Sequence, residues 1–135
     1  MKNNQLSYND YTSWKDFQSY FPEDLQICAD YFPIENYFEY KGNTIHIDHY
    51  IPKVNEKKVK LILVHGGGAN GRLMSPIGIA LLKLGYECVI PDLPGFGLSA
   101  DIAITQHIKA NIIKVFFPHI VAKIQFYDFL TLRWS

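Results

Sequence analysis

The sequence predicts an α/β fold in which an antiparallel hairpin leads into a strand–helix–strand unit with parallel strands. Residues 36–52 alternate apolar and polar side chains on both sides of a Gly-Asn pair, which is typical of a hairpin. Residues 59–91 instead hold two short, continuously apolar runs separated by a stretch of helical periodicity. Such runs are typical of parallel strands that are buried on both faces.

The bulk composition sets wide bounds on size, charge and location. The 135 residues are enough for one domain, and the formal net charge of zero gives no electrostatic reason to expect binding to nucleic acid or to an anionic membrane. Cys28 and Cys88 fit neither a disulfide framework nor a metal cluster, so we expect reduced thiols. The polar N-terminus lacks the apolar core of a signal peptide, and we therefore expect a cytoplasmic protein without a membrane segment.

Residues 1–35 are expected to form an aromatic helical extension ahead of the sheet. Aromatic side chains recur there at helical spacing: Tyr11, Trp14, Phe17 and Phe21. Asn9 or Asp10 is the expected N-cap, because a short polar side chain accepts hydrogen bonds from the free amides of a first turn. Pro22 ends the predicted helix, since proline has no amide hydrogen to continue it.

The predicted hairpin turns at Gly42-Asn43, and its second strand carries three titratable side chains. His46 and Asp48 fall on one face of this strand, and His49 falls on the other. Because two side chains on one face supply fewer ligands than a metal ion needs, we predict no metal site there. We expect His46 and Asp48 to lie on a solvated face of the hairpin.

The strand–helix–strand unit comprises strands at residues 59–64 and 87–91 and a helix over residues 72–86. Apolar side chains at helical spacing predict its buried face: Leu73, Ile77, Leu81 and Leu84. Pro76 suits the first turn of this helix, and Gly85 suits its end.

The glycine-rich loop LVHGGGANGR, residues 63–72, is close to two nucleotide-binding motifs. A P-loop is excluded, because Arg72 and Leu73 stand where the phosphate-binding lysine and the magnesium-binding hydroxyl are needed. The pattern G-x-G-x-x-G is complete, and Asp92 follows at the distance of a ribose-binding acid, so a module that binds NAD or FAD stays open as an alternative. His65 at the strand end and the preceding hairpin disfavour this alternative.

A third interpretation accounts for both segments that flank the helix. LILVHGGG, residues 61–68, resembles the third strand and the H-G-G-G oxyanion loop of the α/β-hydrolase family. IPDLPGFGLS, residues 90–99, resembles the end of that family's fourth strand and the turn beyond it. The hairpin then corresponds to the first two strands, so the resemblance covers residues 36–100. The loop is most like that of hydrolases acting on ester, lipid or peptide bonds.

The resemblance implies a serine-dependent acyl-transfer chemistry without a cofactor. Negative charge develops on a carbonyl oxygen, and backbone amides aimed in advance at that oxygen stabilise it. The resemblance makes Gly67 the first candidate for such a donor and Gly68 the second. A loop-shaping role is implied for five residues: His65, Gly66, Asp92, Gly95 and Gly97.

The family's nucleophile elbow, G-x-S-x-G, does not occur in the chain. The nearest approach is GLSAD at residues 97–101, where Asp101 replaces the last glycine, and we do not expect Ser99 to be a nucleophile. The sequence therefore predicts an incomplete α/β-hydrolase fold from a truncated or frame-shifted product. The intact parent would act on a small-molecule ester or amide, and this chain alone would be inactive.

Residues 101–135 differ in character from the rest of the chain. They lack glycine and are apolar nearly all round, which predicts a helical tail of uncertain origin. This tail, or the open apolar edge of the strand at residues 61–64, is a possible surface for self-association. A non-catalytic interaction protein is therefore a further alternative.

Overall fold

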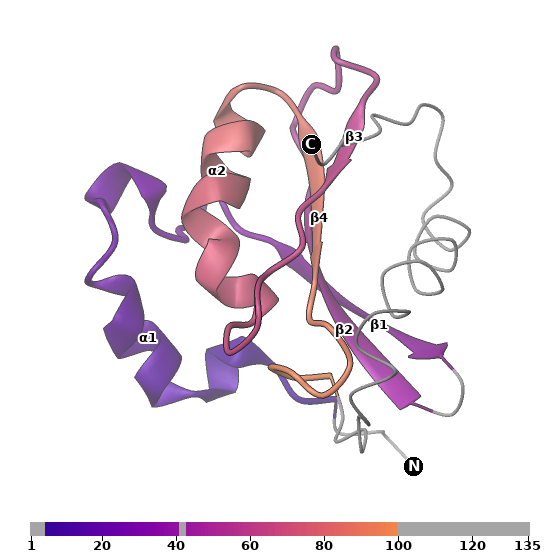
Figure 1. The fold of residues 1–135 in the computed structure, drawn as a ribbon. Coiled ribbons are helices and arrows are strands. Elements are labelled where there is room, and N and C mark those ends of the chain that lie inside the picture. The colour runs from indigo at the N-terminus through magenta and orange to yellow at the C-terminus, as the bar shows by residue number, and fades with distance from the viewer. Residues whose placement is uncertain (1–4, 41–42, 100–135) are drawn as a thin grey trace.

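The computed structural model describes residues 5–40 and 43–99, which form a four-stranded mixed sheet with helices on one side (Figure 1). The strands are β1 (Ile34–Tyr40), β2 (Asn43–Tyr50), β3 (Lys60–Ile62) and β4 (Glu87–Pro91), in the order β1-β2-β4-β3. β2 is antiparallel to both β1 and β4, whereas β3 is parallel to β4. The predicted hairpin followed by a unit with parallel strands is therefore confirmed.

The hairpin register differs slightly from the predicted one. Tyr40 pairs with Asn43, so Asn43 begins β2 and does not belong to the turn. The connection at residues 41–42 lies outside the described residues, as does the predicted tail at residues 101–135. Further along β2, Ile47 pairs with Pro91 and Tyr50 pairs with Cys88, which places the end of β2 beside residues 88–91 of β4.

The sheet carries an apolar cluster on each of its two faces, because successive side chains of a strand point to opposite faces. One cluster consists of Ile45, Ile47 and Val89. The other lies between the sheet and the main helix and has five buried members: Tyr50, Ile79, Leu82, Cys88 and Ile90. Burial raises the pKa of the Cys88 thiol to about 12, so this cysteine behaves as an apolar core residue.

One carboxylate ties three strands together on the face opposite the main helix. Glu87 Oε1 lies 2.6 Å from His49 Nε2 and 2.8 Å from Lys60 Nζ. These side chains come from β4, β2 and β3, respectively. The contacts therefore add polar cross-links to the backbone ladder at the start of the parallel strands.

The main helix, α2 (Ser75–Lys83), follows a short 3-10 turn, η3 (Gly71–Met74). Pro76 lies in its first turn and Gly85 follows its end with φ +84°, as predicted. The predicted buried face was wrong at two of its four residues, since Ile77 is 50% exposed and Leu84 is 63% exposed, whereas Leu81 packs against the core. The residues that face the sheet are Ser75, Gly78, Ile79 and Leu82.

Small side chains explain this orientation of α2. A Cβ atom on Gly78 would lie 2.9 Å from Tyr50 Cε2 and 3.1 Å from Ile90 Cδ1, so the helix approaches the sheet closely only where glycine stands. The tighter winding of the 3-10 turn also takes Leu73 out of register with the residues of α2.

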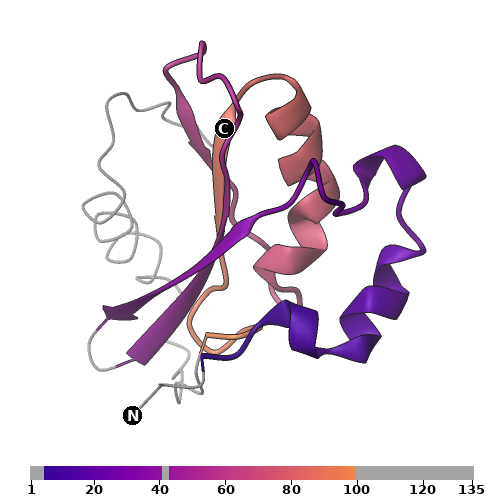
Figure 2. The ribbon, with the colours of Figure 1, turned by 180° about the vertical axis from the view of Figure 1, so that it is seen from behind.

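The N-terminal segment contains η1 (Tyr8–Asp10), α1 (Thr12–Gln18) and η2 (Glu23–Leu25). It lies on the same side of the sheet as α2 (Figure 2). The expected cap at Asn9 or Asp10 was wrong, because the N-cap of α1 is Tyr11, which makes no side-chain capping bond. Ser7 instead forms a capping box with Asp10 around η1. Among the described residues, no helix is long and apolar enough to cross a membrane.

Replacing Gly78 with alanine is expected to destabilise the chain despite the better helix propensity of alanine. The added methyl group meets the fully buried ring of Tyr50, and overpacking of this kind costs ~1–3 kcal/mol. Urea unfolding of Gly78→Ala measures the loss. Ile77→Ala on the exposed face of α2 is the matched control, and an equal effect of both substitutions would contradict the close packing.

Candidate active-site scaffold

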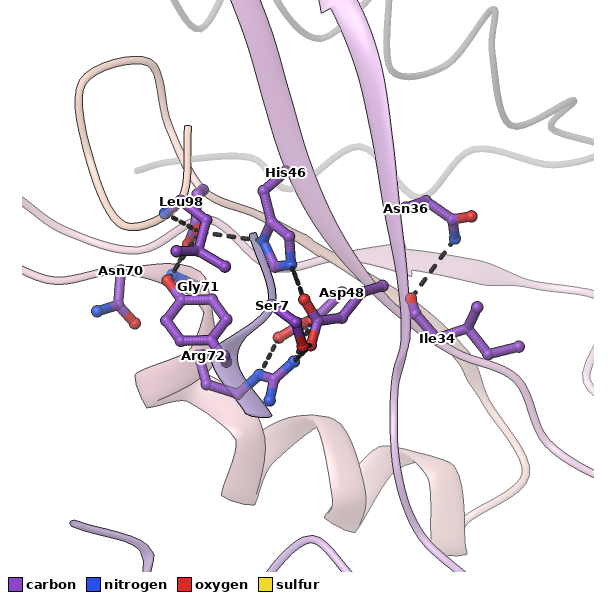
Figure 3. A network of polar contacts seen from close by, with 12 residues as sticks. Ser7, Ile34, Asn36, His46, Asp48, Asn70, Gly71, Arg72 and Leu98 are labelled. Carbon is purple, nitrogen blue, oxygen red and sulfur yellow. Dashed lines mark hydrogen bonds and ion pairs between the residues drawn. The ribbon is translucent and has the colours of Figure 1, made fainter. Parts of the chain in front are cut away.

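Five titratable side chains meet on the α2 side of the sheet, at the end of β4 (Figure 3). They are Glu35 on β1, His46 and Asp48 on β2, Arg72 in η3, and Asp92 directly after β4. His46, Asp48 and Asp92 are fully buried. The expectation of a solvated hairpin face for His46 and Asp48 was therefore wrong. The reason is that Arg72 and the N-terminal segment cover this part of the sheet.

Arg72 is the buried cation of this ionic cluster. Its Nε lies 2.5 Å from Asp48 Oδ2, and its terminal nitrogen lies 2.7 Å from Asp48 Oδ1 and 3.1 Å from Glu35 Oε1. The rings of Tyr8 and Trp14 cover the guanidinium, with centroids 4.6 and 5.4 Å from its central carbon. The contacts with Asp48 raise the pKa of Arg72 against the effect of burial, so its charge is permanent.

His46 lies between two carboxylates. Its Nε2 is 3.0 Å from Glu35 Oε2, and its Nδ1 is 3.0 Å from Asp92 Oδ2, although off the line of a good hydrogen bond. Burial alone would lower the pKa of His46, but the contacts with Asp92 and Glu35 outweigh it and raise the pKa to about 9. The imidazole is therefore charged at neutral pH.

The three carboxylates of the cluster are also matched with donors. Burial alone would raise the pKa of Glu35, but hydrogen bonds from His46 and Ser7 together with the charge of Arg72 lower it to about 2. Burial likewise opposes ionisation of Asp92, and the contact with His46 lowers its pKa. Burial raises the pKa of Asp48, and the hydrogen bonds and charge of Arg72 oppose this rise.

The cluster contains a candidate set of metal ligands, because one ligand atom from each of Glu35, His46 and Asp48 lies within 4.8 Å of the other two. These atoms do not fit a metal ion well. Arg72 already bonds both carboxylate oxygens of Asp48 and one of Glu35, and a histidine with a raised pKa holds the proton that a metal would have to displace. The guanidinium supplies the positive charge of this site.

Asp92 connects four segments of the chain. Its Oδ1 accepts the Gly71 amide at 2.6 Å, and its Oδ2 accepts the Tyr8 hydroxyl at 2.7 Å and the Leu98 amide at 2.8 Å. Its own amide donates to the carbonyl of His46 at 2.9 Å. The start of η3, the N-terminal segment, β2 and the turn at residues 93–98 are therefore all joined through one buried residue.

The turn after β4 is held in place at Gly97 and Ser99. Gly97 has φ +52°, and a Cβ atom there would collide with the Tyr8 hydroxyl and the Asp92 carboxylate. Ser99 is 4% exposed, and its Oγ donates to the carbonyl of Asp92 at 2.6 Å and accepts the His46 amide at 3.1 Å. Gly95, with φ +80°, is exposed. The hydroxyl of Ser99 is thus engaged in the scaffold.

His65 joins the glycine loop to this turn. Its Nε2 accepts the Leu93 amide at 3.0 Å, so the proton of the neutral ring is on Nδ1, which donates to the carbonyl of Gly66 at 2.8 Å. The Ala69 amide donates to the same carbonyl at 3.3 Å. Two donors therefore fix the orientation of the peptide group between Gly66 and Gly67.

The amide of Gly67 points away from His65, because the carbonyl and the amide of a trans peptide point in opposite directions. Within residues 5–40 and 43–99, neither the Gly67 nor the Gly68 amide has an acceptor. Residues 66–68 are exposed, and a Cβ atom at any of them would meet nothing within 4 Å. The loop therefore presents two adjacent free amides on the surface of the described residues.

Comparison with known sequences points to one fold family. Residues 60–124 match the family model described as the alpha/beta hydrolase fold. A stretch of 55 residues is 40% identical to the pimeloyl-[acyl-carrier protein] methyl ester esterase of Legionella pneumophila (strain Corby). This stretch makes up 41% of the present chain and 20% of that protein.

Solved structures of low sequence identity share the arrangement of the sheet. The thioesterase domain from the curacin biosynthetic pathway superposes with a TM-score of 0.58 at 20% identity, over 67% of this chain and 31% of that chain. The haloalkane dehalogenase DpaA from Paraglaciecola agarilytica NO2 superposes with a TM-score of 0.59 at 17% identity, over 76% of this chain and 35% of that chain. The described residues form part of an α/β-hydrolase fold.

The resemblance seen in the sequence is thus confirmed at the level of the hydrolase fold. The chain spans between a fifth and about a third of the length of these relatives. The family match also continues to residue 124, beyond the segment at residues 36–100 that carried the resemblance. The hydrolase fold places the glycine loop and the turn after β4 next to each other, and His65 connects them.

The pH dependence of stability is expected to report the charge on His46. Because its pKa is raised in the folded chain, the stabilisation is fully present below the unfolded value near 6.5 and is lost as the pH rises through about 9. A shift of this size corresponds to roughly 3 kcal/mol of stability. Urea unfolding of the chain between pH 6 and pH 10 measures the loss. The same slope in His46→Gln would contradict the assignment.

Proposed function

We propose that the glycine loop forms the oxyanion-binding side of a serine hydrolase that acts on an ester or a related acyl bond. Gly67 is the first donor and Gly68 the second. The observation that supports this proposal is the pair of bonds from His65 and Ala69 to the Gly66 carbonyl, because they aim the Gly67 amide outward. An amide aimed before the reaction needs no reorganisation when charge develops on the substrate oxygen.

The roles of the neighbouring residues follow from their contacts. His65 and Gly66 orient the loop, whereas Asp92, Gly95 and Gly97 shape the turn on which His65 rests. His65 is not the catalytic base in this proposal, because both ring nitrogens are engaged with the backbone. The second half of the oxyanion hole would come from the residue after a nucleophile.

An ester is the substrate class that the sequence relative supports, since the Legionella protein is named as a methyl ester esterase. The curacin thioesterase domain and the dehalogenase, at 20% and 17% identity, support the fold alone. The H-G-G-G loop at residues 65–68 agrees with an acyl substrate.

The burial of Asp92 supports a hydrolase over a dinucleotide-binding module. An acid that binds a ribose must present a free carboxylate oxygen to the ligand. Asp92 is fully buried, and both of its carboxylate oxygens accept hydrogen bonds from the chain itself.

The role of the Gly67 amide is testable by comparing two substitutions at that position. Gly67→Ala keeps the amide in open space, whereas Gly67→Pro removes it. The probe is dimethylphosphinate, a tetrahedral anion. It is titrated into the isotope-labelled chain while the chemical shifts of the backbone amides are followed by NMR. In the unsubstituted chain we expect the largest saturable shifts at the amides of Gly67 and Gly68. Gly67→Ala should bind the anion with unchanged affinity. Gly67→Pro should bind it at least about fivefold more weakly, as expected for one lost hydrogen bond.

Equal binding by the two Gly67 variants would contradict the proposed donor. An absence of shifts at both glycines of the unsubstituted chain would do the same. The Leu63 amide, which donates to Val89 within the sheet at 3.0 Å, serves as an internal reference that the anion should not perturb.

We further propose that this chain alone does not turn over an ester, because the hydroxyl of Ser99 is engaged and the sequence has no G-x-S-x-G elbow. The assay is hydrolysis of p-nitrophenyl acetate by the 135-residue chain. The expected rate equals that of buffer, for the chain and for Ser99→Ala alike. Turnover that Ser99→Ala abolishes would overturn the proposal.

A further inference from the structure

We propose that the N-terminal segment at residues 7–18 positions the glycine loop, and that Tyr8 is the residue through which it acts. This segment lies outside residues 60–124, which carry the family match. The inference rests on the proposed oxyanion role of the loop. It assigns a positioning role to a residue that touches neither the loop nor a substrate.

The first step is the contact between Tyr8 and Asp92. The Tyr8 hydroxyl donates to Asp92 Oδ2 at 2.7 Å across 84 residues of sequence, and Tyr8 is only 6% exposed. Burial and the nearby carboxylate raise the pKa of Tyr8, so its hydroxyl keeps the proton that it donates. The missing side chain of Gly97 leaves the space in which this bond forms.

The second step runs from Asp92 to the loop. The oxygen that accepts the Tyr8 hydroxyl also accepts the Leu98 amide, which closes the turn after β4. The turn begins at Leu93, whose amide donates to His65 Nε2, and the ring of Phe96 packs edge-on against His65 at 5.4 Å. His65 in turn fixes the Gly66 carbonyl. Movement of the Asp92 carboxylate therefore changes the support of the Gly67 amide.

The third step is the closure of the ionic cluster by the same segment. Ser7 Oγ donates to Glu35 Oε1 at 2.7 Å, and the rings of Tyr8 and Trp14 cover Arg72. Hydrogen bonds to charged groups are stronger where water is excluded. The segment thus keeps Asp92 and its partners in the dry surroundings in which their geometry is well defined.

Tyr8→Phe removes the hydroxyl and keeps the ring, and Tyr37→Phe is its matched control. Both rings lie edge-on to His46, at 5.2 and 5.1 Å, but the buried hydroxyl of Tyr37 has no hydrogen-bond partner among the residues that the structure describes. The readouts are amide exchange at Leu93 and Leu98 and the tautomer of His65, both followed by NMR on the full chain. In Tyr8→Phe we expect both amides to exchange at least tenfold faster relative to Leu63, and His65 to lose its single tautomer.

Using the Leu63 amide as the reference separates a positioning role of Tyr8 from a general loss of stability. A merely structural role of Tyr8 would speed exchange at Leu63 in the sheet as much as at Leu93 and Leu98. Equal acceleration of all three amides would overturn the proposal. A Tyr37→Phe variant that behaves like Tyr8→Phe would overturn it as well.

A measurement on the unsubstituted chain keeps the proposal testable if Tyr8→Phe does not fold. The Tyr11 amide donates to the carbonyl of Tyr8 and reports opening of the segment. With increasing low concentrations of urea, we expect Tyr11, Leu93 and Leu98 to lose protection in one common opening. Exchange at Tyr11 while Leu93 and Leu98 stay protected would overturn the proposal.

The exchange and tautomer measurements do not depend on anion binding. If dimethylphosphinate fails to shift Gly67 and Gly68 while Leu93 and His65 respond to Tyr8→Phe, the hydrolase proposal fails and the link from Tyr8 to the loop stands. If the anion binds and Leu93 and His65 do not respond, the link fails and the hydrolase proposal stands.

Discussion

The bidentate ion pair between Arg72 and Asp48 is the contact on which the rest of the structure depends. Glu35 and Asp48 lie directly opposite each other in the hairpin register, and like charges in such a position repel. Arg72 bonds both carboxylates, and its positive charge compensates their repulsion in this register. Removing one partner of a buried ion pair typically costs ~3–5 kcal/mol, because the other charge stays behind without compensation. The hairpin, η3 and the aromatic cover of the guanidinium are thus joined at one place.

Local sequence patterns were sufficient for the course of the backbone and insufficient for the ionic cluster. Alternation and continuous apolar runs predicted the hairpin and the parallel strands, and Pro76 and Gly85 marked the helix ends, because these signals act over a few residues. The contacts of the cluster and of its aromatic cover join residues up to 84 positions apart, and no local pattern shows which face of the sheet a distant segment will cover. The predicted turn at Gly42-Asn43 would pair Tyr37 with Asp48, so the sequence did not indicate that Glu35 lies opposite Asp48.

The orientation of α2 shows why counting apolar residues failed for this helix. Leucine and isoleucine surround it on most sides, so their spacing alone does not select a face. The close approach to Tyr50 selects the face with Gly78 and Ser75, where small side chains fill the narrow gap. In the candidate site, the sequence indicated the glycines of the loop, whereas the tautomer of His65 that orients them depends on the Leu93 amide and required the structure.

The long separation of Tyr8 and Asp92 bears on the order in which the chain acquires its structure during synthesis. The ribosome releases Tyr8, Glu35, His46 and Asp48 well before Asp92, so the early residues have no partner for the tyrosine hydroxyl and the histidine Nδ1 until β4 has emerged. Contacts of such high sequence separation form late in folding, since a long loop must close first. The glycine loop therefore gains its final support only when nearly all of the described residues are available.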